Sequence, residues 1–178
     1  PRAFDGSVLH VREVERRAGG EVVLHVHPCA YRFYAVQAHG VDCGVRALGA
    51  KAITRADGRI LLGRRATWVM YYPGDWEFVP GGSVPPGRTP AETIVEELFE
   101  EVSLRPLHPP HPIALGFDPR AFSWEVIYDL ELHPGGLPIG SREYDDLSWM
   151  TGGEWPGPLT PIADRMRSLL GEPDIEGD

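Results

Sequence analysis

The first third of the chain alternates apolar and polar residues in two pairs of short runs. Residues 7–36, SVLHVREVERRAGGEVVLHVHPCAYRFYAV, alternate on both sides of RAGG, which is typical of two half-buried strands around a turn. Residues 45–66, VRALGAKAITRADGRILLGRRA, hold two more strand-like runs joined at Ala56-Asp57-Gly58, a hairpin signal. The pattern predicts an antiparallel N-terminal appendage, residues 1–44, followed by the first strands of a main sheet.

Turn residues and further apolar runs organise the rest of the chain. The run DWEFVPGG predicts a short strand that stops at Pro80, Gly81 and Gly82, and the prolines and glycine that follow predict an irregular stretch. The runs HPIALGF, SWEVIYDLELH and DLSWMT predict three more strands. The final EPDIEGD, residues 172–178, is expected to be a frayed, solvated tail.

A helix between these strands is predicted by its start signals and its apolar stripe. Thr89 is a suitable N-cap, Pro90 suits the first helical position, and Glu92 completes a capping box. The stripe consists of five residues at helical spacing: Ala91, Ile94, Val95, Leu98 and Val102. A second amphipathic helix is predicted for PIADRMRSLLG near the C-terminus.

Together these elements predict an α/β fold for residues 45–171. Strands before and after a central helix, with a second helix late in the chain, favour a mixed β-sheet covered on its faces over a sandwich or a bundle. No stretch approaches the roughly 20 apolar residues of a membrane helix, and the N-terminus lacks the apolar core of a signal peptide. The sequence therefore predicts a cytoplasmic protein.

The net charge of the chain argues against some classes of binding partner. The 178 residues carry a formal net charge of −9 without a basic stripe or tail, which argues against nucleic acid or an anionic membrane as the partner. An anionic ligand would therefore need local help, such as a bound cation.

The acidic side of the first predicted helix is the main candidate site. Four acids lie there with no Lys or Arg among them, although like charges three or four residues apart repel each other: Glu96, Glu97, Glu100 and Glu101. A solvated acidic face is one interpretation. Beside a glycine-rich turn, however, converging carboxylates suit Mg²⁺, whose coordination is completed by substrate phosphate oxygens. Such an ion could activate a water whose proton a spare carboxylate takes.

Residues 82–104 resemble the Nudix box of the Nudix hydrolase family, G-x5-E-x7-R-E-U-x-E-E-x-G-U, where U is a bulky aliphatic residue. Gly82 aligns with the first glycine, and the spacing fits without gaps to Leu104. The resemblance implies the Nudix fold, an α/β/α sandwich around a mixed β-sheet. It also implies hydrolysis of a nucleoside diphosphate linked to another moiety, with Mg²⁺ or Mn²⁺ as the cofactor.

The resemblance implies site residues as well. The metal-binding carboxylates would be Glu97, Glu100 and Glu101, with Gly81 as a further metal contact. Glu97 would alternatively orient or deprotonate the attacking water. Glu143, six residues before Trp149, resembles a further ligand or base from the family's later acidic loop, and Asp145 or Asp146 could take its place. A plain acidic turn is the alternative.

Three positions depart from the box. Arg88 stands where the family has Glu, Glu96 stands where it has Arg, and Ser103 replaces the final Gly. The first two departures exchange the signs of two charges, so our hypothesis is that Arg88 and Glu96 pair across the loop. The alternative is drift in a protein that has lost catalysis. Because the metal-binding acids remain, we expect activity, lowered by the altered box.

Four residues near the box are candidate substrate contacts. Arg64 and Arg65, at the end of RILLGRR, could meet phosphate with bidentate donors or remain solvated. Trp76 could stack on a base or belong to the core. Glu77 is a possible phosphate-side or metal-side acid.

The family's subgroups favour ADP-ribose or a nucleoside diphosphate sugar as the substrate. Pro119, fifteen residues after Leu104, resembles the proline of ADP-ribose pyrophosphatases, and the strand-rich N-terminal extension resembles that of the same group. Two rivals remain: a Nudix-fold ligand-binding or regulatory protein with weak or no catalysis, and a dimerisation module. A homodimer would form through the N-terminal strands.

Overall fold

The computed structural model describes residues 6–136, 138–140, 142–151 and 155–171, so the predicted tail, residues 172–178, lies outside the described residues. The described strands are β1 (Ser7–Arg16), β2 (Val22–Ala30), β3 (Ala47–Ala56), β4 (Arg59–Arg65), β5 (Trp76–Phe78), β6 (Gly81–Ser83), β7 (His111–Asp118), β8 (Ser123–Glu131) and β9 (Tyr144–Thr151). The helices are α1 (Tyr31–Ala35), α2 (Pro90–Val102) and α3 (Pro161–Arg167), with short 3-10 segments at Ala18–Gly20, Val36–His39 and Ser168–Leu170.

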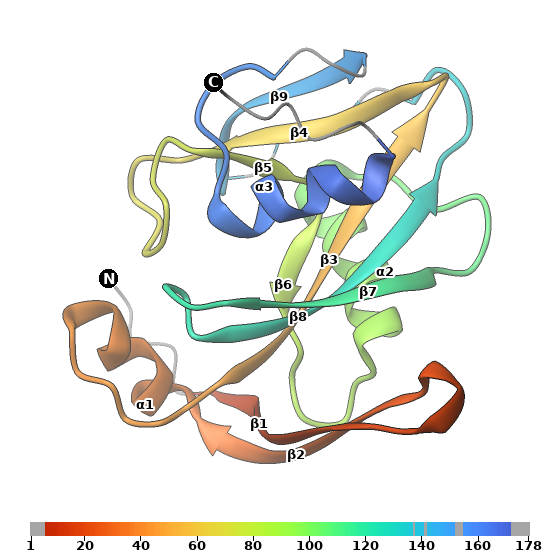
Figure 1. Ribbon diagram of the computed structural model, residues 1–178. Coiled ribbons are helices and arrows are strands. Elements are labelled where there is room, and N and C mark those ends of the chain that lie inside the picture. The colour runs from red at the N-terminus through yellow and green to blue at the C-terminus, as the bar shows by residue number, and fades with distance from the viewer. Residues whose placement is uncertain (1–5, 137, 141, 152–154, 172–178) are drawn as a thin grey trace, which may run out of the picture.

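The strand β3 runs through the middle of a mixed sheet (Figure 1). It pairs in parallel with β8 along its length and antiparallel with β6, β4 and β1 at different points. Beyond these strands, β8 pairs with β7, and β4 pairs with β5 and β9. The predicted turn after β3 is confirmed, since Asp57 and Gly58 take positive φ angles of 52° and 71°.

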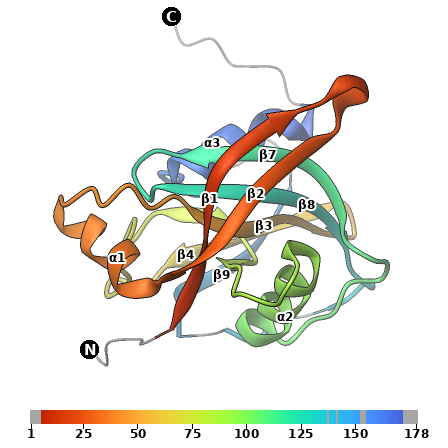
Figure 2. The ribbon, with the colours of Figure 1, turned by 90° about the horizontal axis from the view of Figure 1, so that it is seen from below.

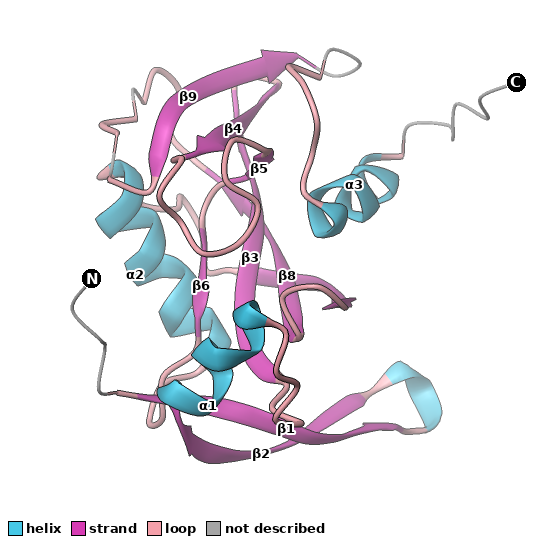
Figure 3. Cartoon of the chain, turned by 90° about the vertical axis from the view of Figure 1, so that its left-hand side faces the viewer, coloured by secondary structure: helices cyan, strands magenta, loops and turns pink. Residues whose placement is uncertain are grey.

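Two helices cover opposite sides of this sheet (Figure 3). On one side the apolar stripe of α2 packs on β3 and β4, burying Ile94, Leu98 and Val102 completely. On the other side α3 inserts Ile162 and Met166 against residues of β5 and β8. The predicted mixed sheet and α/β/α sandwich are therefore confirmed.

The helix α2 begins as its sequence predicts. The Thr89 side chain accepts a hydrogen bond from the Glu92 backbone N–H, and the Glu92 carboxylate accepts one from the Thr89 backbone N–H. Pro90 occupies the first turn. This capping box fixes where the acidic side of the helix starts relative to the loop before it.

The N-terminal strands form an antiparallel hairpin that lies across one end of β3 (Figure 2). The hairpin joins the main sheet where His10 pairs with Ala47. The alternating pattern to residue 36 overestimates the second strand, because Ala30 pairs with Ser7, the first residue of β1, and the strand ladder ends there. The next residues instead form α1.

The glycine-rich turn before α2 is also more regular than its composition predicts. Gly81–Ser83 forms the short strand β6, which pairs with Gly49, Ala50 and Lys51 of β3. This pairing brings the loop against the centre of the sheet and places its glycines next to α2. No helix among the described residues is both long and apolar enough to cross a bilayer.

Candidate active site

A pocket of about 500 Å³ opens where β3 and β6 approach α2 and the loops before β5 and β9. One part of its wall carries charged side chains: Lys51, Arg65, Glu77, Glu97, Glu125 and Glu143. Another part is aromatic: Tyr31, Tyr34, Trp68, Tyr71 and Tyr72. The combination of fixed charges with flat apolar rings suits a nucleotide-like ligand.

Glu97 reaches from α2 over the backbone of Gly82. A Cβ atom at Gly82 would lie 2.0 Å from Glu97 Oε1, so only glycine leaves room for this carboxylate. Burial, together with the charges of Glu100 and Glu143, raises the pKa of Glu97 to about 7. A carboxylate in these surroundings is poised to bind a cation or to exchange a proton near neutral pH.

Glu101 lies one helical turn further and is 4% exposed. Its Oε2 lies 3.4 Å from the Tyr144 hydroxyl oxygen, whereas its buried Oε1 has no hydrogen-bond partner among the described residues. Burial and the nearby charges of Glu97 and Glu77 raise its pKa well above the ordinary value. Glu100, by contrast, is exposed on the helix surface and acts on the site through its charge.

Glu143 lies in the turn before β9 and lines the same pocket as Glu97. Its backbone carbonyl accepts a 2.8 Å hydrogen bond from Ala66 N–H, which ties this turn to the end of β4. Its charge raises the pKa values of both Glu97 and Glu101. The structure therefore brings the predicted residue from the later acidic loop next to the acids of α2.

These acids have the donor chemistry that a hard divalent cation needs. The Oε1 of Glu101, which has no hydrogen-bond partner among the described residues, is available to a cation, and repulsion from Glu97 and Glu143 adds to burial in raising the pKa of Glu101. Within the described residues, no three His, Cys, Asp or Glu side chains already stand in a shared metal-binding arrangement. Gly81 lies beside this cluster, in β6, with its backbone against the Lys51 side chain.

Glu77 is held between two cations. Its Oε2 accepts a 2.7 Å hydrogen bond from Lys51 Nζ, and its Oε1 accepts one from Arg65 Nη1 and another from the Tyr144 hydroxyl at 3.2 Å. Burial opposes ionisation, but Lys51 and Arg65 lower the pKa of Glu77 to about 2. Both oxygens of Glu77 are engaged by protein groups, so its predicted role as a metal-side or phosphate-side acid would require one of these contacts to be exchanged, and it stays a prediction.

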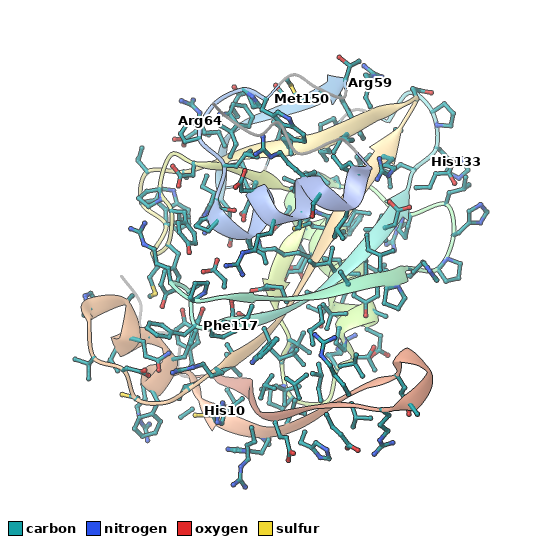
Figure 4. All side chains as sticks on the ribbon, viewed as in Figure 1. His10, Arg59, Arg64, Phe117, His133 and Met150 are labelled. Carbon is teal, nitrogen blue, oxygen red and sulfur yellow. The ribbon has the colours of Figure 1, made fainter. Side chains whose placement is uncertain are left out.

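Two other predicted substrate contacts lie away from the pocket. Side chains alternate along a strand, so Glu77 faces the pocket while Trp76 faces α3, where it is 7% exposed in the core. Arg64 pairs with Trp76 across β4 and β5 and is exposed near β4 (Figure 4). Arg65 does line the pocket.

The exchanged charges of the box stand in contact. Arg88 Nη1 lies 2.6 Å from Glu96 Oε1, and both side chains are nearly half exposed. Ser103, the third departure, adopts the left-handed backbone conformation (φ 59°, ψ 29°) that glycine usually supplies at a helix end. Arg88 and Glu96 thus form one ion pair. Ser103 ends the helix in the left-handed conformation that the glycine of the box would also adopt.

Sequence reasoning missed two charged residues of the pocket wall, Lys51 and Glu125, and the tyrosine that contacts Glu77, Tyr144. Lys51 and Glu125 are single charges inside apolar strands, AKAI and WEVIY, and Tyr144 begins β9. The available signal was a charged residue at a strand position that the alternation predicts to be buried. Such a residue needs an ion-pair partner or a functional role. The partner strand cannot be read from the sequence.

Comparisons with known proteins agree with this geometry. The family model described as NUDIX domain matches residues 45–170. A search of curated proteins gives no significant match.

Solved structures with the same fold come from several organisms. The MutT protein from Methanosarcina mazei Go1 is 22% identical, with a TM-score of 0.54 over 66% of this chain and 86% of that chain. The bifunctional NMN adenylyltransferase/ADP ribose pyrophosphatase from Francisella tularensis is 16% identical, with a TM-score of 0.62 over 77% of this chain and 45% of that chain. The NUDIX domain of Shewanella oneidensis NrtR, solved with ADP ribose, is 20% identical, with a TM-score of 0.55 over 70% of this chain and 85% of that domain. With the family match extending from β3 to the end of α3, this chain belongs to the Nudix family.

Proposed function

We propose that this protein is a divalent-metal-dependent pyrophosphohydrolase that cleaves a nucleoside diphosphate linked to another moiety. The carrying observation is the cluster of Glu97, Glu101 and Glu143, acids from α2 and from the turn before β9 whose mutual repulsion, added to burial, raises the pKa values of Glu97 and Glu101. Divalent cations bound among these carboxylates would relieve that repulsion and would accompany a diphosphate.

The acidic residues share two tasks in this proposal, holding the metal and accepting a proton. Glu97, Glu100, Glu101 and Glu143 would hold Mg²⁺ or Mn²⁺. When bound, the metal neutralises diphosphate oxygens and lowers the pKa of a water molecule. Glu97, with its pKa raised to about 7, would accept the proton of that water.

Arg65 would contact the diphosphate. It donates to Glu77 and to the Tyr71 carbonyl, and these two contacts fix the guanidinium at the pocket wall. A guanidinium held in this way can offer its remaining N–H donors to phosphate oxygens without first losing side-chain freedom.

We favour ADP-ribose or a nucleoside diphosphate sugar as the substrate. The pocket volume of about 500 Å³ and its aromatic wall suit a base together with its diphosphate. Two of the structural relatives carry ADP ribose in their descriptions, one as a pyrophosphatase and one as a complex, which supports this choice.

A substrate panel tests the proposal. Wild-type protein and Glu97→Gln would be incubated with nucleoside diphosphate compounds in the presence of Mg²⁺ or Mn²⁺, and released phosphate esters would be measured. We expect hydrolysis that stops when metal is chelated and falls at least about 100-fold in the variant, the loss typical of a positioned proton acceptor. Hydrolysis that survives Glu97→Gln unchanged would contradict the assigned role.

A ligand-binding or regulatory protein is the second candidate. The exchange of charges at Arg88 and Glu96 favours it, because the residue before Glu97 is now an acid, which adds to the charges that raise the pKa of Glu97. Calorimetric binding of ADP-ribose without turnover under any metal condition would select this candidate over the enzyme.

We also propose a homodimer formed through the N-terminal strands. Within the described residues, β2 pairs on one side only, with β1, and leaves its other edge open. Sedimentation equilibrium would show a dimer mass if this edge pairs with a second copy, and a monomer mass would remove the dimer from the proposal.

A further inference from the structure

Lys51 is the only lysine among the 17 lysine and arginine residues of the chain, and the chemistry proposed above gives it no task. It lies in the middle of β3 and lines the pocket, and its side chain is 12% exposed. An ammonium group is a compact charge with three N–H donors, whereas a guanidinium is larger and planar. The one ammonium side chain of the protein thus lies at the pocket wall.

The ammonium group of Lys51 has donors that the protein does not use. Its Nζ donates a 2.7 Å hydrogen bond to Glu77 Oε2, and the described residues offer it no second acceptor. Two of its three N–H donors are therefore available. Because a largely buried donor without an acceptor is costly, this position favours a ligand that brings oxygen atoms to the ammonium.

The backbone of β6 leaves room for this side chain. Gly81 is the register partner of Lys51, and a Cβ atom there would lie 2.8 Å from Lys51 Nζ and 3.1 Å from its Cγ. The absence of a side chain at Gly81 therefore lets the lysine lie against the strand that leads to α2. The ammonium is held in place before any ligand arrives.

Lys51 and Arg65 contact the two oxygens of one carboxylate. Glu77 Oε2 accepts from Lys51 Nζ, and Glu77 Oε1 accepts from Arg65 Nη1. Both cationic groups are therefore close enough for adjacent phosphate groups to contact them together. Burial lowers the pKa of Lys51, but Glu77 and Glu125 more than offset that effect, so the ammonium stays charged.

We infer that Lys51 is a catalytic residue whose ammonium group binds the diphosphate of the substrate beside Arg65. One available N–H donor of Lys51 contacts a non-bridging phosphate oxygen, while the hydrogen bond to Glu77 keeps the side chain in position. This inference rests on the proposed function, because it takes the diphosphate to lie in this pocket.

The contact gains strength as the diphosphate is cleaved. A water oxygen forms a bond to one phosphorus atom, the bond from that phosphorus to the bridging oxygen breaks, and its electron pair stays on the departing phosphate. One water proton passes to Glu97, and Lys51 keeps all of its protons. Because negative charge grows on the departing phosphate, a fixed ammonium beside it binds the transition state more tightly than the substrate.

The single lysine allows the contact to be observed without turnover. Protein labelled with ¹³C and ¹⁵N in lysine alone would give one lysine side-chain spin system, that of Lys51. Methylenediphosphonate, whose P–C–P bridge cannot be hydrolysed, would be added at saturating Mg²⁺, with sulfate at equal ionic strength as the control. We expect the Cε and Nζ resonances to shift and saturate with diphosphonate but not with sulfate. Resonances that stay unchanged in diphosphonate, or that shift equally in sulfate, would overturn the inference.

Two variants separate a substrate contact from a structural role. Lys51→Gln should bind methylenediphosphonate about 10- to 100-fold more weakly by calorimetry, the loss of a charged hydrogen bond. Its kcat should fall about 100-fold, as for the removal of one donor to the transition state. Arg55→Gln, on the same strand but outside the pocket and paired with Asp129, should bind like the wild type.

The stability of Lys51→Gln is a separate readout. If the folded variant binds diphosphonate as tightly as Arg55→Gln does, Lys51 is only a counter-ion of Glu77 and the inference fails. If the variant does not fold, the titration of the labelled wild-type protein decides.

The outcome for Lys51 is separable from the outcome for the proposed function. If the Lys51 resonances respond and Lys51→Gln loses affinity while no nucleoside diphosphate compound is hydrolysed, the proposed function fails and the diphosphate contact stands. If a compound is hydrolysed and Lys51→Gln retains the wild-type kcat/KM, the contact fails and the proposed function stands.

Discussion

At the scale of single residues, charged side chains from β3, β4 and β5 form ion pairs at the pocket wall. Glu77 forms an ion pair with both Lys51 and Arg65 and holds both side chains against the pocket wall. Removing one member of such a buried set leaves the others uncompensated, which costs more than the set itself contributes. We therefore expect the loss of Glu77 to lower the stability of the fold.

The variant Glu77→Gln should destabilise the protein at neutral pH by about 3 to 5 kcal/mol, because two buried cations lose their counter-charge. The pKa of Glu77 is lowered in the folded state, to about 2 from 4.5, so its contribution to stability is present above pH 4.5. That contribution is lost as the pH falls from about 4.5 towards 2. Urea unfolding of both proteins across this range should show the difference shrinking with acid, and a constant difference would contradict the assignment.

The variant Gly82→Ala should reduce turnover far more than stability. Its Cβ would occupy the place of Glu97 Oε1, so the carboxylate must move, while the backbone at Gly82 needs no positive φ. A loss of at least about 10-fold in kcat is expected for a misplaced catalytic group. Gly140→Ala is the matched control, since its Cβ would meet only Leu147 Cδ1, at 3.9 Å. Equal activities of the two variants would argue against the positioning of Glu97 by Gly82.

At the scale of elements, α2 is the best predicted part of the molecule, because its start depends on local contacts. Thr89, Pro90 and Glu92 lie within four residues, and each has its predicted place in the cap. The apolar stripe is likewise local and periodic, and it faces the sheet as predicted. Glu101 shows the limit of the pattern, since it lies next to the stripe yet is buried against Tyr144 from a distant strand.

The pairing of Arg88 with Glu96 can be tested by exchanging the two residues. The single variants Arg88→Glu and Glu96→Arg each place like charges in contact and should lower kcat by disturbing the loop before Glu97. The double variant restores an ion pair with the signs of the usual box and should regain activity. The coupling in stability should be below about 1 kcal/mol, because both side chains are nearly half exposed. Additive losses in the double variant would show that the pair does not hold the loop.

Apart from β6, which was not predicted, the strands were predicted with approximately correct bounds, but the side of the sheet that each residue faces was predicted less well. Three residues of β5 are too few to establish which side is apolar, so Trp76 and Arg64 were assigned to the site although both lie on the α3 side. Lys51 and Glu125 were missed because their strands are far apart in sequence and become neighbours only through the parallel pairing of β3 with β8. Pairing between distant strands depends on the whole core and leaves no short pattern.

At the scale of the whole molecule, the N-terminal hairpin and the Nudix region share a core. Val8 and Tyr34 pack with Val45 and Ala47 in one buried cluster, and Tyr31 and Tyr34 form part of the pocket wall. The boundary at residues 44 and 45 therefore divides the sequence but crosses a continuous packing unit. Substrate recognition is expected to depend on both sides of it.

Full-length protein should unfold in one calorimetric transition, because the shared cluster couples the hairpin to the sheet. A chain that begins at residue 45 should lose solubility or unfold at a lower temperature, since it exposes Val45 and Ala47. Two separate transitions in the full-length protein, or a truncated chain with the original midpoint, would show that the hairpin folds independently.

The contact between Arg88 and Glu96 also limits which single substitutions these two positions tolerate. Changing either residue alone to its usual counterpart would place two acids or two bases face to face beside Glu97. A return to the common arrangement would thus need two substitutions to arrive together or to pass through a weakened intermediate. The two positions are therefore expected to tolerate a joint exchange of signs better than a change at either one alone.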